Sequence, residues 1–73
     1  MNKTVLITGA SGFLGSHLCD LFISKKYRVI GIDNLITGHI NNISHLKNNT
    51  NFKFEKIDIT TDFQIKEKID FIL

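Results

Sequence analysis

The sequence predicts an α/β fold, in which a parallel sheet of about four strands in the order 3-2-1-4 is flanked by helices. Two observations lead to this prediction. Short apolar runs alternate with amphipathic stretches along the 73 residues, and such alternation gives parallel pairing through right-handed crossovers. A glycine-rich turn also joins the first apolar run to the first helical pattern. We expect one small domain with a marginal core, because a chain this short buries only about 60% of its unfolded surface.

The first half of the chain has the pattern of a strand, a turn, a helix and a second strand. Residues 5–8 are apolar on both faces, which is typical of a buried parallel strand. A helical pattern follows from about Gly12 to Lys25. Its three- and four-residue spacing predicts one apolar face, made of Leu14, Leu18, Leu21 and Phe22. Residues 27–32 form the second predicted strand, which ends at Asp33.

The second half repeats this alternation less clearly. Apolar residues at threefold spacing predict a short helix from about Ile40 to Leu46, and the alternation over residues 52–59 predicts a third strand. Thr61 can cap a helix over about residues 62–68. Residues 70–73 begin a fourth apolar run, which would be a central strand in a complete sheet.

Composition excludes several classes of function. Nine Lys and Arg against seven Asp and Glu give a net charge of +2, which is too weak to indicate nucleic acid. One cysteine cannot form an intrachain disulfide, and the scattered histidines lack the spacing of zinc ligands. No apolar run approaches the roughly 18 residues that span a membrane, and no signal peptide is evident. We expect a cytoplasmic protein without metal, nucleic-acid or membrane partners.

Three kinds of side chain invite a functional interpretation, and for each we favour a structural one. His17 should be partly buried and donate to the backbone. Cys19 should pack in the core, because it has no nearby base to activate its thiol. Base stacking by aromatic rings is the alternative to core packing for Phe52, Phe54, Phe63 and Phe71.

The glycine turn carries the clearest functional signal. Its glycines fall three apart, after a predicted strand and at the start of a helix, which is the context of a dinucleotide-binding motif. Gly9 would turn the chain, Gly12 would let the backbone approach a diphosphate, and Gly15 would let the helix lie close to the sheet. Free amides at the helix start would then meet the anion. The candidate residues are Gly9, Ser11, Gly12, Phe13, Leu14 and Gly15.

Two other interpretations of this turn have less support than dinucleotide binding. A glycine turn can serve packing alone. A Walker-type phosphate loop requires a Gly-Lys-Ser/Thr sequence, and no lysine occurs between Lys3 and Lys25.

Two carboxylates at predicted strand ends complete the candidate site. Asp33 follows Gly15 by 18 residues and can accept hydrogen bonds from the adenosine ribose. It would repel a 2′-phosphate, which favours NAD over NADP, and Arg28 lies at the far end of that strand. Asp33 could instead only cap the following turn. Asp58 can accept a bond from the adenine amino group while Ile59 packs on the ring, although Asp58 would also be unremarkable as a strand-end residue.

The run from Val5 to Leu18 resembles the opening of extended short-chain dehydrogenases/reductases, and more closely the NAD-dependent epimerase/dehydratase family that modifies nucleotide sugars. The later segment of Asp33-Asn34-Leu35, Thr37-Gly38, Asn41-Asn42 and Ile43 looks most like UDP-glucuronate decarboxylases and dTDP-glucose 4,6-dehydratases. The resemblance implies a Rossmann fold and NAD as cofactor. It also implies adenosine-ribose contacts from Asn34, Thr37 and Gly38, and adenine contacts from Asp58 and Ile59.

The chain is much shorter than the members of this family, and it lacks their catalytic residues. The family's catalytic pair is a Tyr with a Lys four residues later, whereas Tyr27 is followed at that distance by Gly31. We therefore assign no catalytic residue. We expect residues 1–73 to be the truncated N-terminal part of an NAD(P)-binding Rossmann domain, without a substrate domain.

Three hypotheses about function follow. In the first, the chain is the NAD-binding portion of a nucleotide-sugar epimerase, dehydratase or decarboxylase, of which the last two are lyases. In the second, it is a stand-alone NAD-binding or sensing module. In the third, it is the remnant of a truncated gene. For the first, the partners would be a nucleotide sugar in the complete enzyme and a complementing C-terminal fragment, with a homodimer for full-length relatives. We expect weak NAD binding, or none, by the chain alone.

Overall fold

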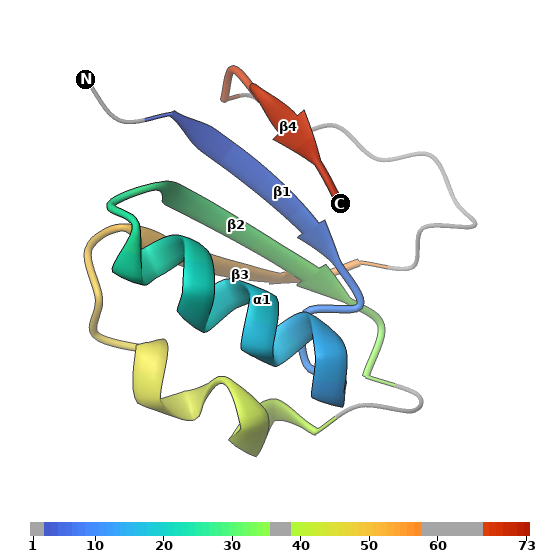
Figure 1. Ribbon diagram of the computed structural model, residues 1–73. Helices are drawn as coiled ribbons and strands as arrows, with labels where there is room; N and C mark the ends of the chain where they lie inside the picture. The colour runs from blue at the N-terminus through green and yellow to red at the C-terminus, as the bar shows by residue number, and fades with distance from the viewer. Residues whose placement is uncertain (1–2, 36–38, 58–66) are drawn as a thin grey trace.

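Four parallel strands form the sheet, and the helical segments that the structure describes lie on one side of it. The computed structural model describes residues 3–35, 39–57 and 67–73. Along the chain the elements are β1 (Thr4–Thr8), α1 (Phe13–Ser24), β2 (Arg28–Asp33), η1 (Ile40–Asn42), η2 (Ser44–Leu46), β3 (Phe52–Lys56) and β4 (Phe71–Ile72). The strand order is β3-β2-β1-β4 (Figure 1). Both the α/β class and the predicted order are confirmed.

The register of the sheet brings the carboxyl ends of two strands together. β1 pairs with β2 from Thr4 opposite Arg28 to Thr8 opposite Ile32. Since the strands are parallel, the chain leaving β1 and the last residue of β2, Asp33, lie at the same edge of the sheet. This edge therefore holds the predicted glycine turn beside the predicted ribose-binding carboxylate.

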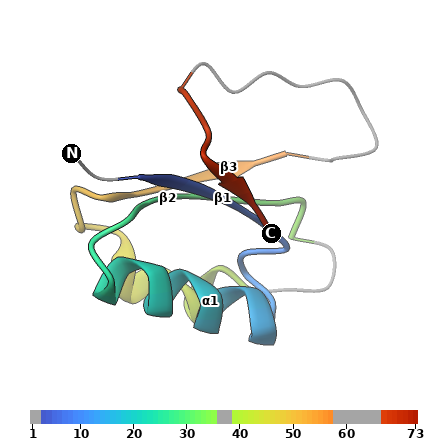
Figure 2. The same cartoon turned by 45° about the horizontal axis from the view of Figure 1, so that its top comes forward.

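Both faces of the central strands are apolar, as the sequence predicts for buried parallel strands. On the face covered by α1 and the two 3-10 turns (Figure 2), the buried core contains Val5, Ile7, Ala10, Cys19, Val29 and Leu46. On the opposite face Leu6, Ile30 and Ile32 are buried, and Ile57 and Ile69 pack against them. Side chains alternate between faces along a strand, so β1 and β2 contribute to both clusters.

The buried face of α1 differs from the predicted one. Leu14 and Leu21 are exposed, whereas the buried residues of the helix are Gly15, Ser16 and Cys19. Leu18 and Phe22 do pack against the core, as predicted. Small side chains allow α1 to approach the sheet closely, and this close approach outweighs the burial of the two larger leucines.

The remaining elements are shorter than predicted. Two 3-10 turns, η1 and η2, replace the single helix expected over residues 40–46. β3 ends at Lys56, and the predicted strand end at Asp58 and Ile59 lies outside the described residues. So does the expected helix over residues 62–68, apart from residues 67 and 68, which are not helical.

The strand β4 forms one edge of the sheet and is short. It pairs with β1 through Val5 opposite Phe71 and Leu6 opposite Ile72. Phe71 is exposed, so its predicted place in the core is wrong. Within the described residues, no helix is long and apolar enough to cross a membrane.

A second long-range contact fixes the start of β2. Arg28 donates from Nε to Glu67 Oε1 at 3.1 Å and from Nη2 to Oε2 at 3.4 Å, while Nη1 donates to the carbonyl of Thr50 at 2.9 Å. Arg28 therefore lies at the opposite end of β2 from Asp33, as predicted, and ties that end to two other segments.

Candidate functional site

The turn after β1 has the tight geometry that the sequence predicts. Gly9 adopts a positive φ of 65°, in the left-handed region that glycine reaches without steric strain. The amide of Gly12 donates to the carbonyl of Gly9 at 3.0 Å, and the amide of Ala10 donates to Ile32 at the end of β2 at 3.1 Å. We call residues 9–15 the glycine loop. It is anchored to both central strands.

Gly15 is required by the close approach of α1 to this loop. A Cβ at position 15 would lie 2.0 Å from the carbonyl oxygen of Gly9 and 3.0 Å from Cα of Ala10. A Cβ at Gly12 would lie 3.3 Å from the same oxygen, which is tight without being impossible. The close helix packing assigned to Gly15 is therefore present, and its contact is with the turn that leaves the sheet.

Within the described residues, the first turn of α1 presents backbone amides that have no acceptor. The first intrahelical bond runs from Ser16 N to the carbonyl of Gly12 at 2.9 Å, so the amides of Phe13, Leu14 and Gly15 precede it. Among the described residues no acceptor is found for these three amides. Phe13 and Leu14 are 80% and 71% exposed. Such amides, at the positive end of a helix dipole, form the kind of site that binds a phosphate group.

Asp33 lies directly beside the glycine loop. Its Oδ2 accepts from the amide of Ser11 at 2.9 Å and from the Ser11 hydroxyl at 2.6 Å. Its Oδ1 accepts from the amide of Leu35 at 3.0 Å. Ser11 is fully buried and Asp33 is only 8% exposed. The Ser11 side chain thus holds the carboxylate and is not open to solvent.

These bonds decide the ionisation of Asp33. Burial alone would raise the pKa of the carboxyl, because desolvation disfavours the charged form. The hydrogen bonds from Ser11, Leu35 and Asn34 outweigh this effect, so the pKa lies below its ordinary value of 3.8. Asp33 is therefore a carboxylate at neutral pH, the form that accepts hydrogen bonds from hydroxyls.

The alternative role considered for Asp33, capping the turn that follows it, is present in the structure. The bond to Leu35 spans two residues and holds Leu35 at a φ of 64°, which is uncommon for a bulky side chain. The turn-capping role is therefore the one that the structure describes, and the contact with a ribose hydroxyl stays a prediction. A carboxylate offers about four lone-pair positions, and Ser11, Leu35 and Asn34 all donate to Asp33.

The other predicted residues fall into two groups. Asn34 is half-buried and directly follows β2 at this edge of the sheet. Four predicted cofactor contacts lie outside the described residues: Thr37, Gly38, Asp58 and Ile59.

The histidine and cysteine of α1 are not part of the site. His17 is exposed and makes an edge contact with the Phe13 ring, at 4.6 Å between centroids, so its predicted partial burial is wrong. Cys19 is fully buried, as predicted. Burial, reinforced by the neighbouring charge of Asp20, raises the pKa of its thiol to about 12. The thiol is therefore protonated and unreactive at neutral pH.

Two residues near the glycine loop had no predicted role. Gly31 faces the loop from β2, where a Cβ would lie 2.7 Å from Cβ of Ala10. Asn42 donates from Nδ2 to the carbonyl of Ser11 at 2.7 Å. The close approach at Gly31 depends on how the loop folds back over β2. Asn42 is one of several asparagines between residues 41 and 51, and the family resemblance includes Asn41-Asn42 without giving either residue a role.

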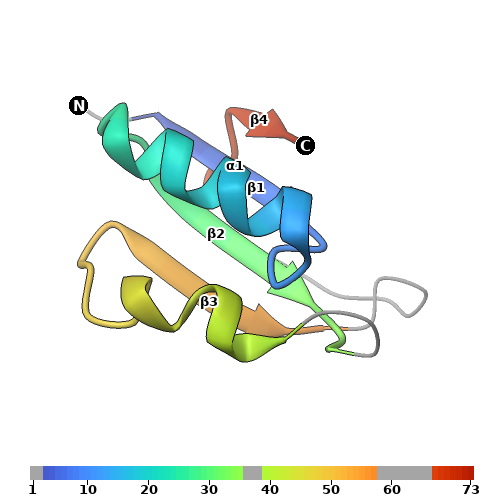
Figure 3. The ribbon, with the colours of Figure 1, turned by 60° about the horizontal axis from the view of Figure 1, so that its bottom comes forward.

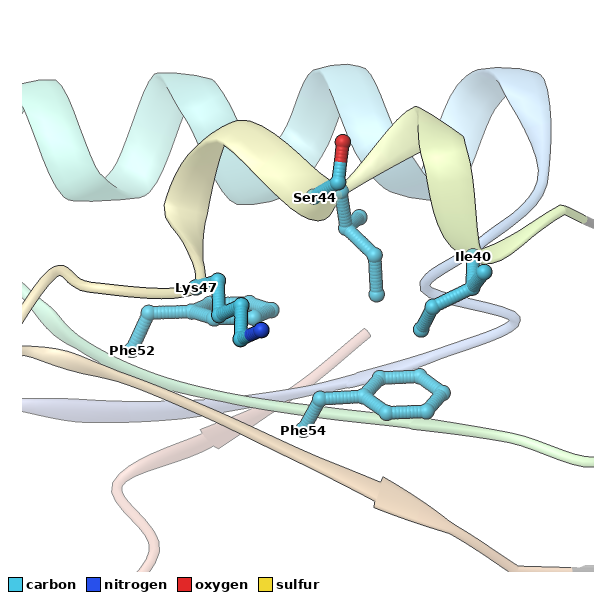
Figure 4. A pocket seen from close by; sticks show the side chains of 6 residues that line it. Ile40, Ser44, Lys47, Phe52 and Phe54 are labelled. Atoms are coloured by element: carbon cyan, nitrogen blue, oxygen red, sulfur yellow. The ribbon is translucent and has the colours of Figure 1, made fainter.

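A mostly apolar hollow lies elsewhere in the described part of the chain. It has a volume of about 450 Å³, between the 3-10 turns and β3 (Figure 4). Its lining is mostly apolar and consists of Ile40, Ile43, Ser44, Lys47, Phe52 and Phe54. It shares no residue with the glycine loop or Asp33, so it does not define the site at the strand ends.

Comparison with known proteins gives the same family from sequence and from structure. A sequence model of the GDP-mannose 4,6-dehydratase family matches residues 6–72. A candidate UDP-glucose 4-epimerase of Methanocaldococcus jannaschii is 45% identical over 67 residues, which is 92% of this chain and 20% of that protein. UDP-glucuronic acid decarboxylase 4 of Arabidopsis thaliana is 42% identical over 55 residues, 75% of this chain and 12% of that protein.

Among solved structures, the dTDP-glucose 4,6-dehydratase of Bacillus anthracis in complex with NAD superposes with a TM-score of 0.74 at 30% identity. The match covers 78% of this chain and 19% of that enzyme. The chain thus spans a fifth or less of the length of each of these relatives. The expected resemblance to nucleotide-sugar epimerases, dehydratases and decarboxylases is confirmed, and the chain belongs to the GDP-mannose 4,6-dehydratase family.

Proposed function

We propose that this chain binds NAD, as the dinucleotide-binding part of a nucleotide-sugar epimerase, dehydratase or decarboxylase. The diphosphate would be held by the amides of Phe13, Leu14 and Gly15, and the adenosine ribose by Asp33. Residues 1–73 would form the N-terminal part of the cofactor domain. They would orient the cofactor, which supplies a hydride acceptor when bound.

The observation that carries the proposal is the set of unpaired amides at the start of α1, presented beside a buried carboxylate. Gly9 and Gly15 bring the amides to this position, and no side chain competes for them among the described residues. Asp33 lies at the same edge of the sheet and is linked to the loop through Ser11. A diphosphate next to a ribose diol matches these two features in charge and in hydrogen bonding.

Asp33 also supports NAD over NADP. Its depressed pKa keeps a negative charge where a 2′-phosphate would have to lie. Arg28, which could offset this charge, is bonded to Glu67 and Thr50 at the far end of β2. The electrostatic contribution at the ribose therefore opposes the extra phosphate.

The experiment is an NMR titration of the ¹⁵N-labelled 73-residue chain with NAD, NADP and ADP. We expect the resonances of Phe13, Leu14 and Gly15 to move with NAD and ADP at similar, weaker than micromolar, affinity, because the glycine loop and Asp33 would contact only the adenosine diphosphate half. NADP should bind more weakly. The absence of shifts in the glycine loop at 10 mM NAD would contradict the proposal. This concentration is on the order of ten thousand times a dissociation constant of 1 μM.

A charge-matched pair of variants sharpens this test. Asp33→Asn should reduce the preference for NAD over NADP, because it removes the charge next to the ribose. Asp20→Asn removes the same charge from α1, where Asp20 pairs with His45 at 2.6 Å, and should leave the preference unchanged. An equal effect of both variants would mean that Asp33 acts only through net charge.

A further inference from the structure

The carbonyl of Ser11 is held by two donors from the segment after β2. The amide of His39 donates to it at 3.1 Å, and Nδ2 of Asn42 donates to it at 2.7 Å. Because a carbonyl oxygen can only accept, the atom of Asn42 that faces it must be the amide nitrogen. The side chain of Asn42, from η1, therefore reaches back to the glycine loop, which lies near η1 in Figure 3.

This contact completes the fixation of the turn that leads into α1. The amide of Gly12 donates to Gly9, the amide of Ser11 donates to Asp33, and the carbonyl of Gly12 accepts from Ser16. The Ser11–Gly12 peptide is thus held at its nitrogen by the turn itself and at its oxygen by the side chain of Asn42 and the amide of His39. Its orientation matters because the next amides in the chain are those of the helix start.

We propose that Asn42 is a positioning residue for the diphosphate. By holding the Ser11 carbonyl, Asn42 fixes the Ser11–Gly12 peptide and so aims the unpaired amides of Phe13 and Leu14. It also keeps the negative end of the Ser11 carbonyl turned toward η1. The diphosphate as ligand rests on the function proposed above, whereas the positioning of the loop rests on the contacts alone.

The contacts separate positioning from simple support of the fold. Without the Asn42 side chain, the Ser11 carbonyl would keep the amide of His39, so no buried acceptor would be left unpaired. Asn42 is itself an exposed residue, whose removal leaves the core intact. Its loss should therefore act on the orientation of one peptide and much less on global stability.

Asn41 provides a matched control. It belongs to the same 3-10 turn and is also exposed, and its side chain has no partner in the described part of the chain. Asn42→Asp places a carboxylate against a carbonyl, which repels it, while Asn41→Asp adds the same charge one residue away. The difference between the two variants isolates the contact with Ser11.

Two measurements test the proposal, both under conditions where circular dichroism shows every variant folded. In the ligand-free chain, the Gly12 amide should exchange about tenfold faster in Asn42→Ala and Asn42→Asp than in the wild type. The ADP dissociation constant should rise about five- to tenfold in Asn42→Ala and further in Asn42→Asp. Both quantities should change by less than about twofold in Asn41→Ala and Asn41→Asp.

Each outcome decides one question. Equal exchange and equal ADP affinity in the Asn42 and Asn41 variants would overturn the positioning role. If the wild-type chain binds no ADP, the proposed function fails, and the exchange rate of Gly12 still decides whether Asn42 fixes the loop. Faster exchange with unchanged ADP affinity would refute the link to the diphosphate.

Discussion

Replacing Gly15 by alanine is the most direct test of how α1 sits on the glycine loop. The added Cβ would lie 2.0 Å from the carbonyl oxygen of Gly9, against an ordinary contact distance of at least 3.4 Å. The helix must therefore retreat by about 1.4 Å, or the loop must deform, because the opposing atoms are backbone and have no rotamer to adopt. Such overpacking typically costs about 1–3 kcal/mol, and we expect the upper end here.

A loss of this size is large for so small a protein. A domain of this length has a free energy of unfolding of about 3–5 kcal/mol, so a loss near 3 kcal/mol leaves the Gly15→Ala variant only about 0–2 kcal/mol of stability at 25 °C. Urea unfolding followed by circular dichroism measures the difference. Gly12→Ala is the control, because its Cβ would meet the same oxygen at 3.3 Å and should cost about 1 kcal/mol or less. A Gly15→Ala chain within 0.5 kcal/mol of the wild type, a margin set by the roughly 10–15% extrapolation error, would refute the packing argument.

Three further results are expected. The stability that Asp33 gains from its hydrogen bonds should be fully present above its ordinary pKa of 3.8 and lost as the pH falls through the lower pKa of the folded state. The free energies of unfolding of the wild type and Asp33→Asn, measured in urea, should therefore converge at acid pH. A difference between them that stays constant down to pH 2, about two units below the ordinary pKa, would exclude this. The Cys19 thiol, with its pKa of about 12, should react with a disulfide reagent at neutral pH only in urea, and rapid reaction of the folded chain would contradict its burial. A double-mutant cycle of Arg28→Ala and Glu67→Ala should give a coupling free energy of about 0.5–1 kcal/mol. This coupling should fall in 0.5 M salt, where the screening length is roughly 4 Å. Zero coupling at low salt would show that the ion pair does not stabilise the sheet.

The elements with strong local rules were predictable from sequence. β1, the glycine loop and the end of β2 at Asp33 were expected within one residue, because a buried apolar strand followed by spaced glycines permits few other structures. The close packing at Gly15 followed from the same rule, although its contact is with the turn after β1 and not with the sheet itself. The sheet order then followed from the alternation of strands and helices.

Packing at close range was not predictable in the same way. Hydrophobic periodicity assigned Leu14 and Leu21 to the buried face of α1, but the helix packs through Gly15, Ser16 and Cys19. Periodicity scores each residue by its transfer free energy and ignores the distance between helix and loop. Here the close approach at Gly15 rotates the helix toward its small residues.

Polar contacts across the chain were the least predictable part of the site. The sequence indicated Asp33 as a ligand residue and Ser11 as a loop residue, but their mutual bond at 2.6 Å requires the two strand ends to be in register. Asn42 is one of many asparagines, and only the position of η1 beside the glycine loop brings it to the Ser11 carbonyl.

The purely parallel pairing has a consequence for how the chain folds. Paired residues are 24 apart between β1 and β2, 23 apart between β2 and β3, and 66 apart between β1 and β4. Among the described strands, no hairpin can therefore nucleate the sheet, and each of the three ladders requires a long segment of chain to close first. High contact order of this kind slows folding. We expect β1, α1 and β2 to assemble before β4 pairs. Only two residues of β4 are paired, and their pairing must offset the largest loss of chain entropy.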